Sequence, residues 1–307
     1  MLSDIRTFSS NELFDYLKLL AKKFRKLNGK NTPAELYLVG GASILLNYNF
    51  REMTSDIDAI IRASSAMKDA IRQVSDEHNL PIDWLNTDFK NTTSYTPNIM
   101  KYADYRCELS NVLRVYTISA EYLVAMKLKA GRSYKHDLSD VVGILAEHND
   151  LSRNNGRKPI TMDMINTAII NLYGSLDAIS DKSYAFVNQV IETNNYSILL
   201  EETKADEKKA AEHMSEFKQK YPNVMNCDNV EDILKSISEK EKNKTVSSFD
   251  DTEKYYLEID SEQLKSLEKS GIAFELNPQK TIAAVAIVDK EKALECISKS
   301  DKPKLKR

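Results

Sequence analysis

The stretch that decides the fold is Leu36-Tyr37-Leu38-Val39-Gly40-Gly41-Ala42-Ser43, followed further along by Asp56-Ile57-Asp58-Ala59-Ile60-Ile61. Both apolar runs are short, which is typical of buried strands. Because side chains alternate across a strand, Asp56 and Asp58 are expected on one face while Ile57 points into the core. Two carboxylates held side by side repel each other, and one pKa rises unless a divalent cation lies between them. The pair therefore indicates a metal site.

The glycine pair comes directly before an apolar helix expected over residues 42–48. The first N–H groups of a helix are free to receive phosphate oxygens, and glycine has no Cβ to block the approach. A phosphate site and a Mg²⁺ site in one short unit suggest nucleotide chemistry.

Two blocks of sequence resemble a known family. The first is Val39-Gly40-Gly41-Ala42-Ser43 with Arg51, Thr54, Ser55 and Asp56-Ile57-Asp58. It is similar to the signature of the nucleotidyltransferase superfamily related to DNA polymerase beta, and its spacing fits the AbiEii-type branch of abortive-infection and toxin–antitoxin systems better than the generic pattern. The second block is an apolar helix carrying Lys127, followed by Asp137-Leu138-Ser139-Asp140. The resemblance covers roughly residues 34–147.

The resemblance implies a transferase that moves a nucleoside monophosphate from a nucleoside triphosphate to an acceptor hydroxyl on tRNA or protein, with a cognate antitoxin as a further partner. Two Mg²⁺ ions about 3.5–4 Å apart, bridged by Asp56 and Asp58, would polarise the α-phosphate and activate the acceptor. Gly40, Gly41 and Ser43 would cradle the outer phosphates.

The remaining site residues leave alternatives open. The superfamily places a third carboxylate on a later strand. Asp83, on a short strand expected over residues 82–85, is the candidate, and Glu108 is its competitor. The alternative for Asp83 is a structural role in which its side chain caps a turn. Arg51 would reach the phosphates or would be a surface cation, and Ser55 is expected only to support the site.

Lys127 lies in an otherwise apolar helical segment, where a charge is costly unless its tip reaches water or an anion. The matching lysine of the related toxins contacts the triphosphate, and the alternative is a lysine that extends from the helix edge to solvent. Asp137 matches the family's acid and is expected to pair with Lys127 or Arg132, to cap the following helix, or to do both.

Composition narrows the class of protein. The chain has 307 residues and an apolar fraction of 42%, which is enough for packed cores. Its net charge of −3 gives no overall indication of a nucleic-acid partner. No run approaches the roughly 20 apolar residues of a membrane span, and the N-terminus lacks a secretory signal, so a cytoplasmic location and no membrane partner are expected. Cys107, Cys227 and Cys296 are scattered, which fits neither a disulfide framework nor a zinc site.

The pattern of elements predicts an α/β (α+β) fold in which a mixed sheet is flanked by helices. A nucleotidyltransferase domain is expected over residues 1–150, ending in a polar linker, then a helical accessory region over 151–245 and a small α/β module over 246–307. Lys235 to Asp251, rich in Lys, Glu and Ser, is interpreted as a linker.

Three functions remain open. The first is nucleotidyl transfer in a toxin–antitoxin or phage-defence role, favoured by the intact Gly-Gly and Asp-x-Asp. The second is an antibiotic nucleotidyltransferase, which would need an acidic pocket that the sequence does not reveal. The third is a non-catalytic regulator with the same fold, which the loss of a carboxylate would suggest.

Overall fold

The computed structural model describes residues 6–193, 195–226, 229–247, 254–270, 272, 274–276, 282–286 and 290–298. The chain divides into two compact units, Met1–Ser215 and Glu216–Arg307. The expected boundary near residue 150 lies inside the first unit.

A five-stranded mixed sheet of order β5-β4-β2-β7-β6 forms the centre of the first unit. Its central strand β2 (Ala34–Leu38) pairs antiparallel with β4 (Ile57–Arg62) and parallel with β7 (Leu113–Ile118). The edges are β5 (Leu85–Asn86), parallel to β4, and β6 (Ala103–Leu109), antiparallel to β7. The expected mixed α/β fold is confirmed. Two short strands, β1 (Phe8–Ser9) and β3 (Met53–Thr54), form a separate antiparallel pair. In the chain, β1 comes before β2 and β3 comes after it.

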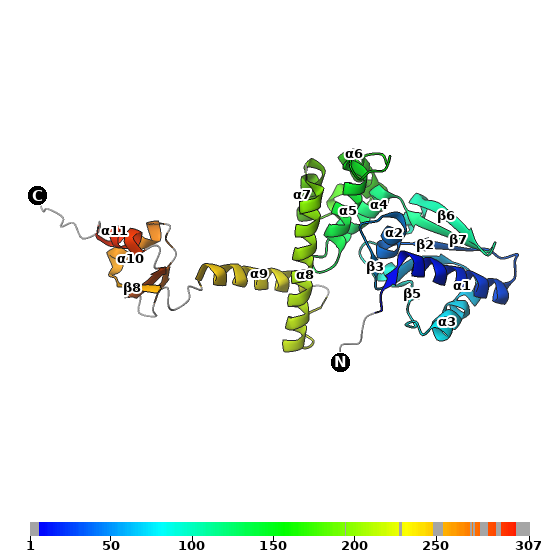
Figure 1. Ribbon diagram of the computed structural model, residues 1–307, viewed down its shortest axis with the longest axis horizontal. Helices are drawn as coiled ribbons and strands as arrows, with labels where there is room; N and C mark the ends of the chain where they lie inside the picture. Colours follow the sequence, from blue (N-terminus) through cyan, green and yellow to red (C-terminus); the bar gives the residue numbers. More distant parts are fainter. Residues whose placement is uncertain are drawn as a thin grey trace, which may run out of the picture. The chain divides into compact units, whose positions relative to one another are not determined.

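Helices cover both faces of the sheet (Figure 1). Leu36 and Leu38 pack toward α1 (Ser10–Asn28) and α3 (Ala66–His78), while Tyr37, between them, belongs to the core on the other face. This division follows from the alternation of side chains along a strand. Helix α1 begins with a capping box, in which Ser9 and Glu12 bond each other's backbone N–H groups.

The second face is covered by α4 (Ala120–Ala130), α5 (Asp137–Asn149), α6 (Met162–Tyr173) and α7 (Asp181–Glu192). Between these helices and the sheet lie the 3₁₀ turns η1 (Asp88–Asn91) and η2 (Pro97–Tyr102), and η3 (Leu176–Ala178) joins α6 to α7. Tyr196 and Leu200, from the start of α8 (Tyr196–Lys220), complete this core. The helices after residue 150 therefore share a core with the sheet.

One expected strand, over residues 82–85, is wrong. Residues 82–84 form a turn, and only Leu85 and Asn86 pair with β4. Pro81 has no N–H for a strand ladder, and the Trp84 N–H instead donates back to the Pro81 carbonyl at 3.0 Å. The Trp84 ring is buried, and its indole N–H donates to the Ile71 carbonyl.

The second unit contains a three-stranded antiparallel sheet of order β8-β10-β9, from β8 (Lys254–Glu258), β9 (Phe274–Leu276) and β10 (Ile282–Ala286). Helices α10 (Ser261–Ser270) and α11 (Lys290–Ser298) pack on it. This small α/β module was expected from the sequence. The linker expected from Lys235 is wrong as far as residue 247, because α9 (Val230–Ser247) continues through it, and residues 248–251 lie outside the described part of the chain. No helix in the described residues is long and apolar enough to cross a membrane.

Candidate active site

The glycine turn and the acid pair meet at one end of the sheet. Helix α2 (Gly40–Asn47) starts at Gly40, whose φ of +53° is a conformation that glycine adopts readily. A Cβ built on Gly40 would lie 3.7 Å from Asp58 Oδ2, and the Val39 N–H donates to the Asp58 carbonyl at 3.0 Å. The N-cap of α2, Val39, offers no capping side chain. The turn is therefore directly beside the Asp58 carboxylate.

Asp56 and Asp58 flank the buried Ile57, as the strand pattern predicts. Asp56 is exposed just before β4, and Asp58 is half-buried within it. Burial, and then the charge of Asp56, raise the pKa of Asp58, while the Asn86 side chain, Lys135 and Lys127 act in the opposite direction. The charge of Asp56 is thus close enough to oppose the ionisation of Asp58.

Lys127 is the centre of a buried ion network. Its Nζ lies 3.0 Å from Asp137 Oδ1 and 2.8 Å from Asp140 Oδ2. Arg51 Nη1 donates to both oxygens of Asp140, at 2.9 and 2.7 Å. Arg132 Nε donates to Asp137 Oδ2 at 2.7 Å. Asp137 and Asp140 are three residues apart in α5 and lie on the same face of the helix. One turn of α5 therefore binds three cationic side chains.

The network sets the charge states of its members. Burial alone lowers the pKa of Lys127, but Asp140 and Asp137 outweigh it and raise that pKa above its ordinary value. Burial works to raise the pKa of Asp137, and Lys127 and Arg132 overcome it, so that this pKa lies well below its usual range. Lys127 and Asp137 are therefore both charged at neutral pH.

Arg51 connects this network to the glycine turn. A Cβ on Gly41 would lie 2.6 Å from Thr54 Oγ1 and 3.0 Å from Arg51 Nη2. Only a glycine lets the guanidinium lie this close to the first turn of α2. Arg132 lies at the other end of the network, where burial acts to lower its pKa, Asp137 outweighs that effect and raises it, and Asp58 adds a smaller contribution. The two arginines thus lie beside the two halves of the candidate site.

Asp140 was missing from the residues assigned a role from sequence. The signal was present in the Asp-x-x-Asp motif, which places Asp137 and Asp140 on one helix face. The motif alone did not show that Asp140 pairs with Arg51.

Of two further predicted residues, Ser43 points away from the solvent side of the site and Ser55 is exposed. Ser43 is fully buried, and its hydroxyl accepts a hydrogen bond from the Ile118 N–H of β7 at 3.0 Å. Ser55 is exposed in the turn before β4, where the hydroxyl of its neighbour Thr54 donates to the Asp56 carbonyl at 3.1 Å. The Ser43 bond thus holds the glycine turn against β7, and the Thr54 bond stabilises the turn that carries Asp56.

The structure brings neither candidate third carboxylate to the pair. Asp83 is exposed in the turn before β5. Glu108, on β6, pairs with Arg114 of β7 and lies three strand spacings from β4, or about 14 Å. In the part of the chain that is described, no group of three or more His, Cys, Asp and Glu side chains is arranged to hold a metal. The residue opposite Asp58 on β5 is Asn86.

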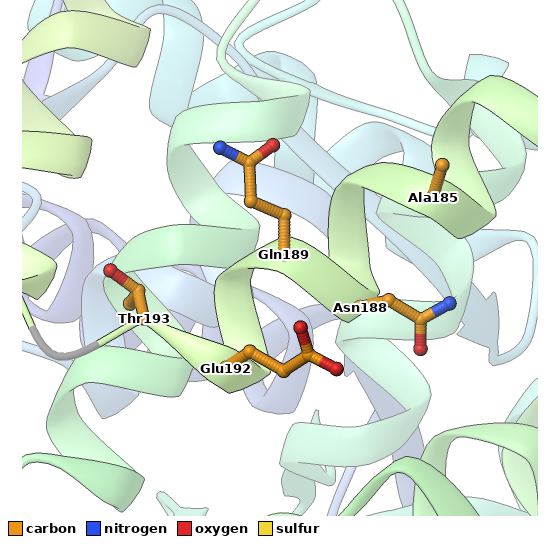
Figure 2. Close-up of a pocket in the computed structure, with 5 residues that line it drawn as sticks. All are labelled: Ala185, Asn188, Gln189, Glu192 and Thr193. Carbon is orange, nitrogen blue, oxygen red and sulfur yellow. The ribbon is translucent and has the colours of Figure 1, made fainter.

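A shallow hollow elsewhere on the first unit contributes nothing to this site. It lies along one helix, α7, and is lined by Ala185, Asn188, Gln189, Glu192 and Thr193 (Figure 2). It contains none of the residues of the ion network or the acid pair.

Comparison with known proteins supports the superfamily. Residues 15–155 match a family model described as "Nucleotidyltransferase of unknown function (DUF6036)". This segment contains the glycine turn, the acid pair and the whole ion network. The match supports membership of this segment in the nucleotidyltransferase superfamily and nucleotidyl transfer as its general chemistry. A search of curated proteins and a search of solved structures each found no match.

Proposed function

We propose that this protein is a Mg²⁺-dependent nucleotidyltransferase that transfers a nucleoside monophosphate from a nucleoside triphosphate to an acceptor hydroxyl. One observation carries the proposal: the Gly40 turn lies against Asp58, Arg51 lies beside that turn, and a buried network joins Arg51 to Arg132. Binding a metal-bound triphosphate needs carboxylates, free helix N–H groups and fixed cations in one place.

The residues fit a divalent cation. Asp58 is partly buried beside Asp56, so the two ionised carboxylates are held together at a cost that a cation between them would remove. Mg²⁺ is commonly bound by one or two carboxylates, with water and substrate phosphates completing its shell. Asp56 and Asp58 would hold the metal. A bound Mg²⁺ would supply charge stabilisation at the α-phosphate and a lower pKa for the acceptor hydroxyl.

Cationic side chains of the protein would bind the phosphate oxygens that the metal does not contact. Arg51 and Arg132 each bond one carboxylate of α5, which fixes the guanidinium planes before substrate arrives. Such pre-organised donors bind phosphate oxygens with little loss of side-chain freedom. Lys127, whose side chain is only 11% exposed, holds Asp137 and Asp140 together. It thereby fixes the positions of Arg51 and Arg132, which bond these two acids. Gly40 and Gly41 leave the N–H groups of α2 open to the outer phosphates.

We assign the acceptor to tRNA or protein, in a toxin–antitoxin or phage-defence setting with a cognate antitoxin as partner. Support comes from the AbiEii-type signature, whose arginine, lysine and Asp-x-x-Asp positions meet in one network as Arg51, Lys127, Asp137 and Asp140. An antibiotic acceptor would require an acidic pocket for a cationic substrate, and the hollow along α7 has a single acid, Glu192, in its lining.

A second candidate function is nucleotide binding without transfer. The position beside Asp58 on β5 is occupied by Asn86, whose side-chain amide hydrogen-bonds the Asp58 carboxylate and partly offsets the rise in its pKa that burial causes. The Asn86 Oδ1 accepts the Asp88 N–H at 2.9 Å, so the amide donates toward Asp58. An amide cannot serve as a base for the acceptor hydroxyl, which favours a regulator.

The two candidates are separated by one experiment. Full-length protein is incubated with Mg²⁺ and each α-labelled nucleoside triphosphate in the presence of total tRNA or cell protein. We expect label in one of these fractions and none with Asp58→Asn. Asp83→Asn is the matched control, since it removes an exposed acid of the same type, and a loss of transfer there would restore Asp83 as the third carboxylate. Nucleotide binding without any transfer would select the regulator.

A further inference from the structure

Helix α5 carries both acids of the ion network, yet it lacks a cap of its own. Its N-cap residue, His136, makes no side-chain capping bond. Asp137, the first residue of the helix, is fully buried and committed to Lys127 and Arg132. The free N–H groups of the first helical turn therefore need an acceptor from elsewhere.

Glu207 of α8 supplies that acceptor. Its Oε1 accepts the Leu138 N–H at 2.9 Å and the Ser139 N–H at 3.0 Å. These are the second and third residues of α5, whose N–H groups a capping side chain normally takes. Glu207 is only 3% exposed, so its carboxylate was removed from water to make these two bonds. Its Oε2 makes no hydrogen bond and lies 3.7 Å from His136 Nδ1.

Glu207 is also the last buried residue of α8. The buried positions are Tyr196, Leu200, Thr203 and Glu207, spaced by four, three and four residues, so they form one stripe along the helix. Tyr196 and Leu200 pack in the same core as α5, which anchors the stripe. After Glu207 no residue of the helix is buried, and the chain passes into the second compact unit after Ser215.

We propose that Glu207 is a positioning residue for the candidate active site: it fixes the start of α5, and through Asp137 and Asp140 it orients Lys127, Arg51 and Arg132. This inference rests on the proposed function, because its consequence is weaker binding of a nucleoside triphosphate when the cap is lost. Glu207 lies beyond residues 15–155, the segment that the family model matches. The site therefore depends on an element outside the segment that carries its signature.

The arrangement also makes α8 a control point. Glu207, whose side chain bonds the N-terminus of α5, is at the end of the docked part of α8, before the helix runs on to the second unit. A displacement of this part of α8 removes the cap without touching Asp56 or Asp58. Nucleotide affinity then falls while the metal-binding acids stay in place.

The test compares full-length wild-type protein with Glu207→Ala, Glu207→Gln and Glu202→Ala, the last removing an exposed acid of the same helix. Binding of each nucleoside triphosphate with Mg²⁺ is measured by calorimetry, and KM and kcat by label transfer. A lost helix cap corresponds to about a tenfold change in an equilibrium constant. We expect Glu207→Ala to raise Kd and KM about tenfold and leave kcat at saturating nucleotide nearly unchanged. Glu207→Gln, which keeps an acceptor oxygen, and Glu202→Ala should bind like wild type.

Hydrogen exchange of the Leu138 and Ser139 amides gives a second readout, and we expect both amides to exchange faster in Glu207→Ala alone. Faster exchange with unchanged Kd would overturn the proposal, because the cap would then not be coupled to the site. If Glu207→Ala does not fold, Glu207→Asp, which keeps the charge and shortens the reach, is measured instead, and wild-type affinity there would equally overturn it. Failure of the wild-type protein to bind any nucleotide would refute the proposed function itself, and this role of Glu207 with it.

Discussion

Replacing Gly41 by alanine has two opposite effects on the stability of the fold. Gly41 lies in the first turn of α2 with no positive φ, so helix propensity alone predicts that Gly41→Ala stabilises the fold by about 1 kcal/mol. The added Cβ, however, would lie 2.6 Å from Thr54 Oγ1, 3.0 Å from Arg51 Nη2 and 3.2 Å from Arg51 Cζ. The Thr54 hydroxyl must therefore move, and the Arg51 guanidinium must shift by a few tenths of an ångström.

These movements break the Thr54 bond to the Asp56 carbonyl and weaken the two Arg51 bonds to Asp140, whose side chain is only 3% exposed. Lys127 remains with Asp140, so the lost Thr54 bond and the weakened Arg51–Asp140 pair together cost about 2–3 kcal/mol. After the gain in helix propensity, we expect a net loss of about 1–2 kcal/mol, which lowers the Tm of a unit of this size by about 2–8 °C.

The assay is thermal unfolding of the full-length protein, combined in a double-mutant cycle with Arg51→Ala. In the Arg51→Ala background the clash is relieved in part, and Gly41→Ala should cost less. Gly156→Ala is the control, because a Cβ there meets no atom within 4 Å and reports only the cost of its φ of +78°. A raised Tm for Gly41→Ala, or an equal effect in both backgrounds, would refute the reasoning.

Three further predictions concern the charged residues. Lys127→Met should lower stability by about 3 kcal/mol, since Asp137 and Asp140 lose their shared cation, and the urea midpoint measures it. Asp137, whose folded pKa is depressed, contributes stability that is present above its ordinary pKa of about 3.9 and lost as pH falls. Urea curves of wild type and Asp137→Asn should therefore differ most at neutral pH and converge in acid. Burial and Asp56 raise the pKa of Asp58, so its ionised form opposes folding above that pKa. Metal-free Asp58→Asn should melt higher than wild type at neutral pH but not in acid, and a lower Tm at neutral pH would contradict the sign.

The local features of the site could be predicted from sequence. Strand alternation around Ile57 fixes the direction of Asp56 and Asp58, and the glycine turn follows from residue type. The helix over Lys127 and the one after it were likewise predicted, because apolar periodicity over many residues is a strong signal.

The pairing of Asp137 with Lys127 or Arg132 was predicted, but the pairs that join distant segments of the chain could not be. Arg51 bonds Asp140 across 89 positions, and Glu207 reaches Ser139 across 68, and no local pattern specifies such partners. Ser43 belongs to the predicted motif, yet the packing of α2 on β7 turns its hydroxyl inward to Ile118. The strand expected around Asp83 was lost to a turn at Pro81, because burial of Trp84 in the core decided the local conformation.

The central claim is that the acid pair and the glycine turn together bind a metal-bound triphosphate. Its most direct test is a Mn²⁺ titration followed by electron paramagnetic resonance, with and without nucleoside triphosphate, on wild type and Asp58→Asn. The account predicts that nucleotide increases the amount of Mn²⁺ bound by the wild-type protein and that Asp58→Asn abolishes this increase. Equal nucleotide-dependent Mn²⁺ binding by the two proteins would contradict it.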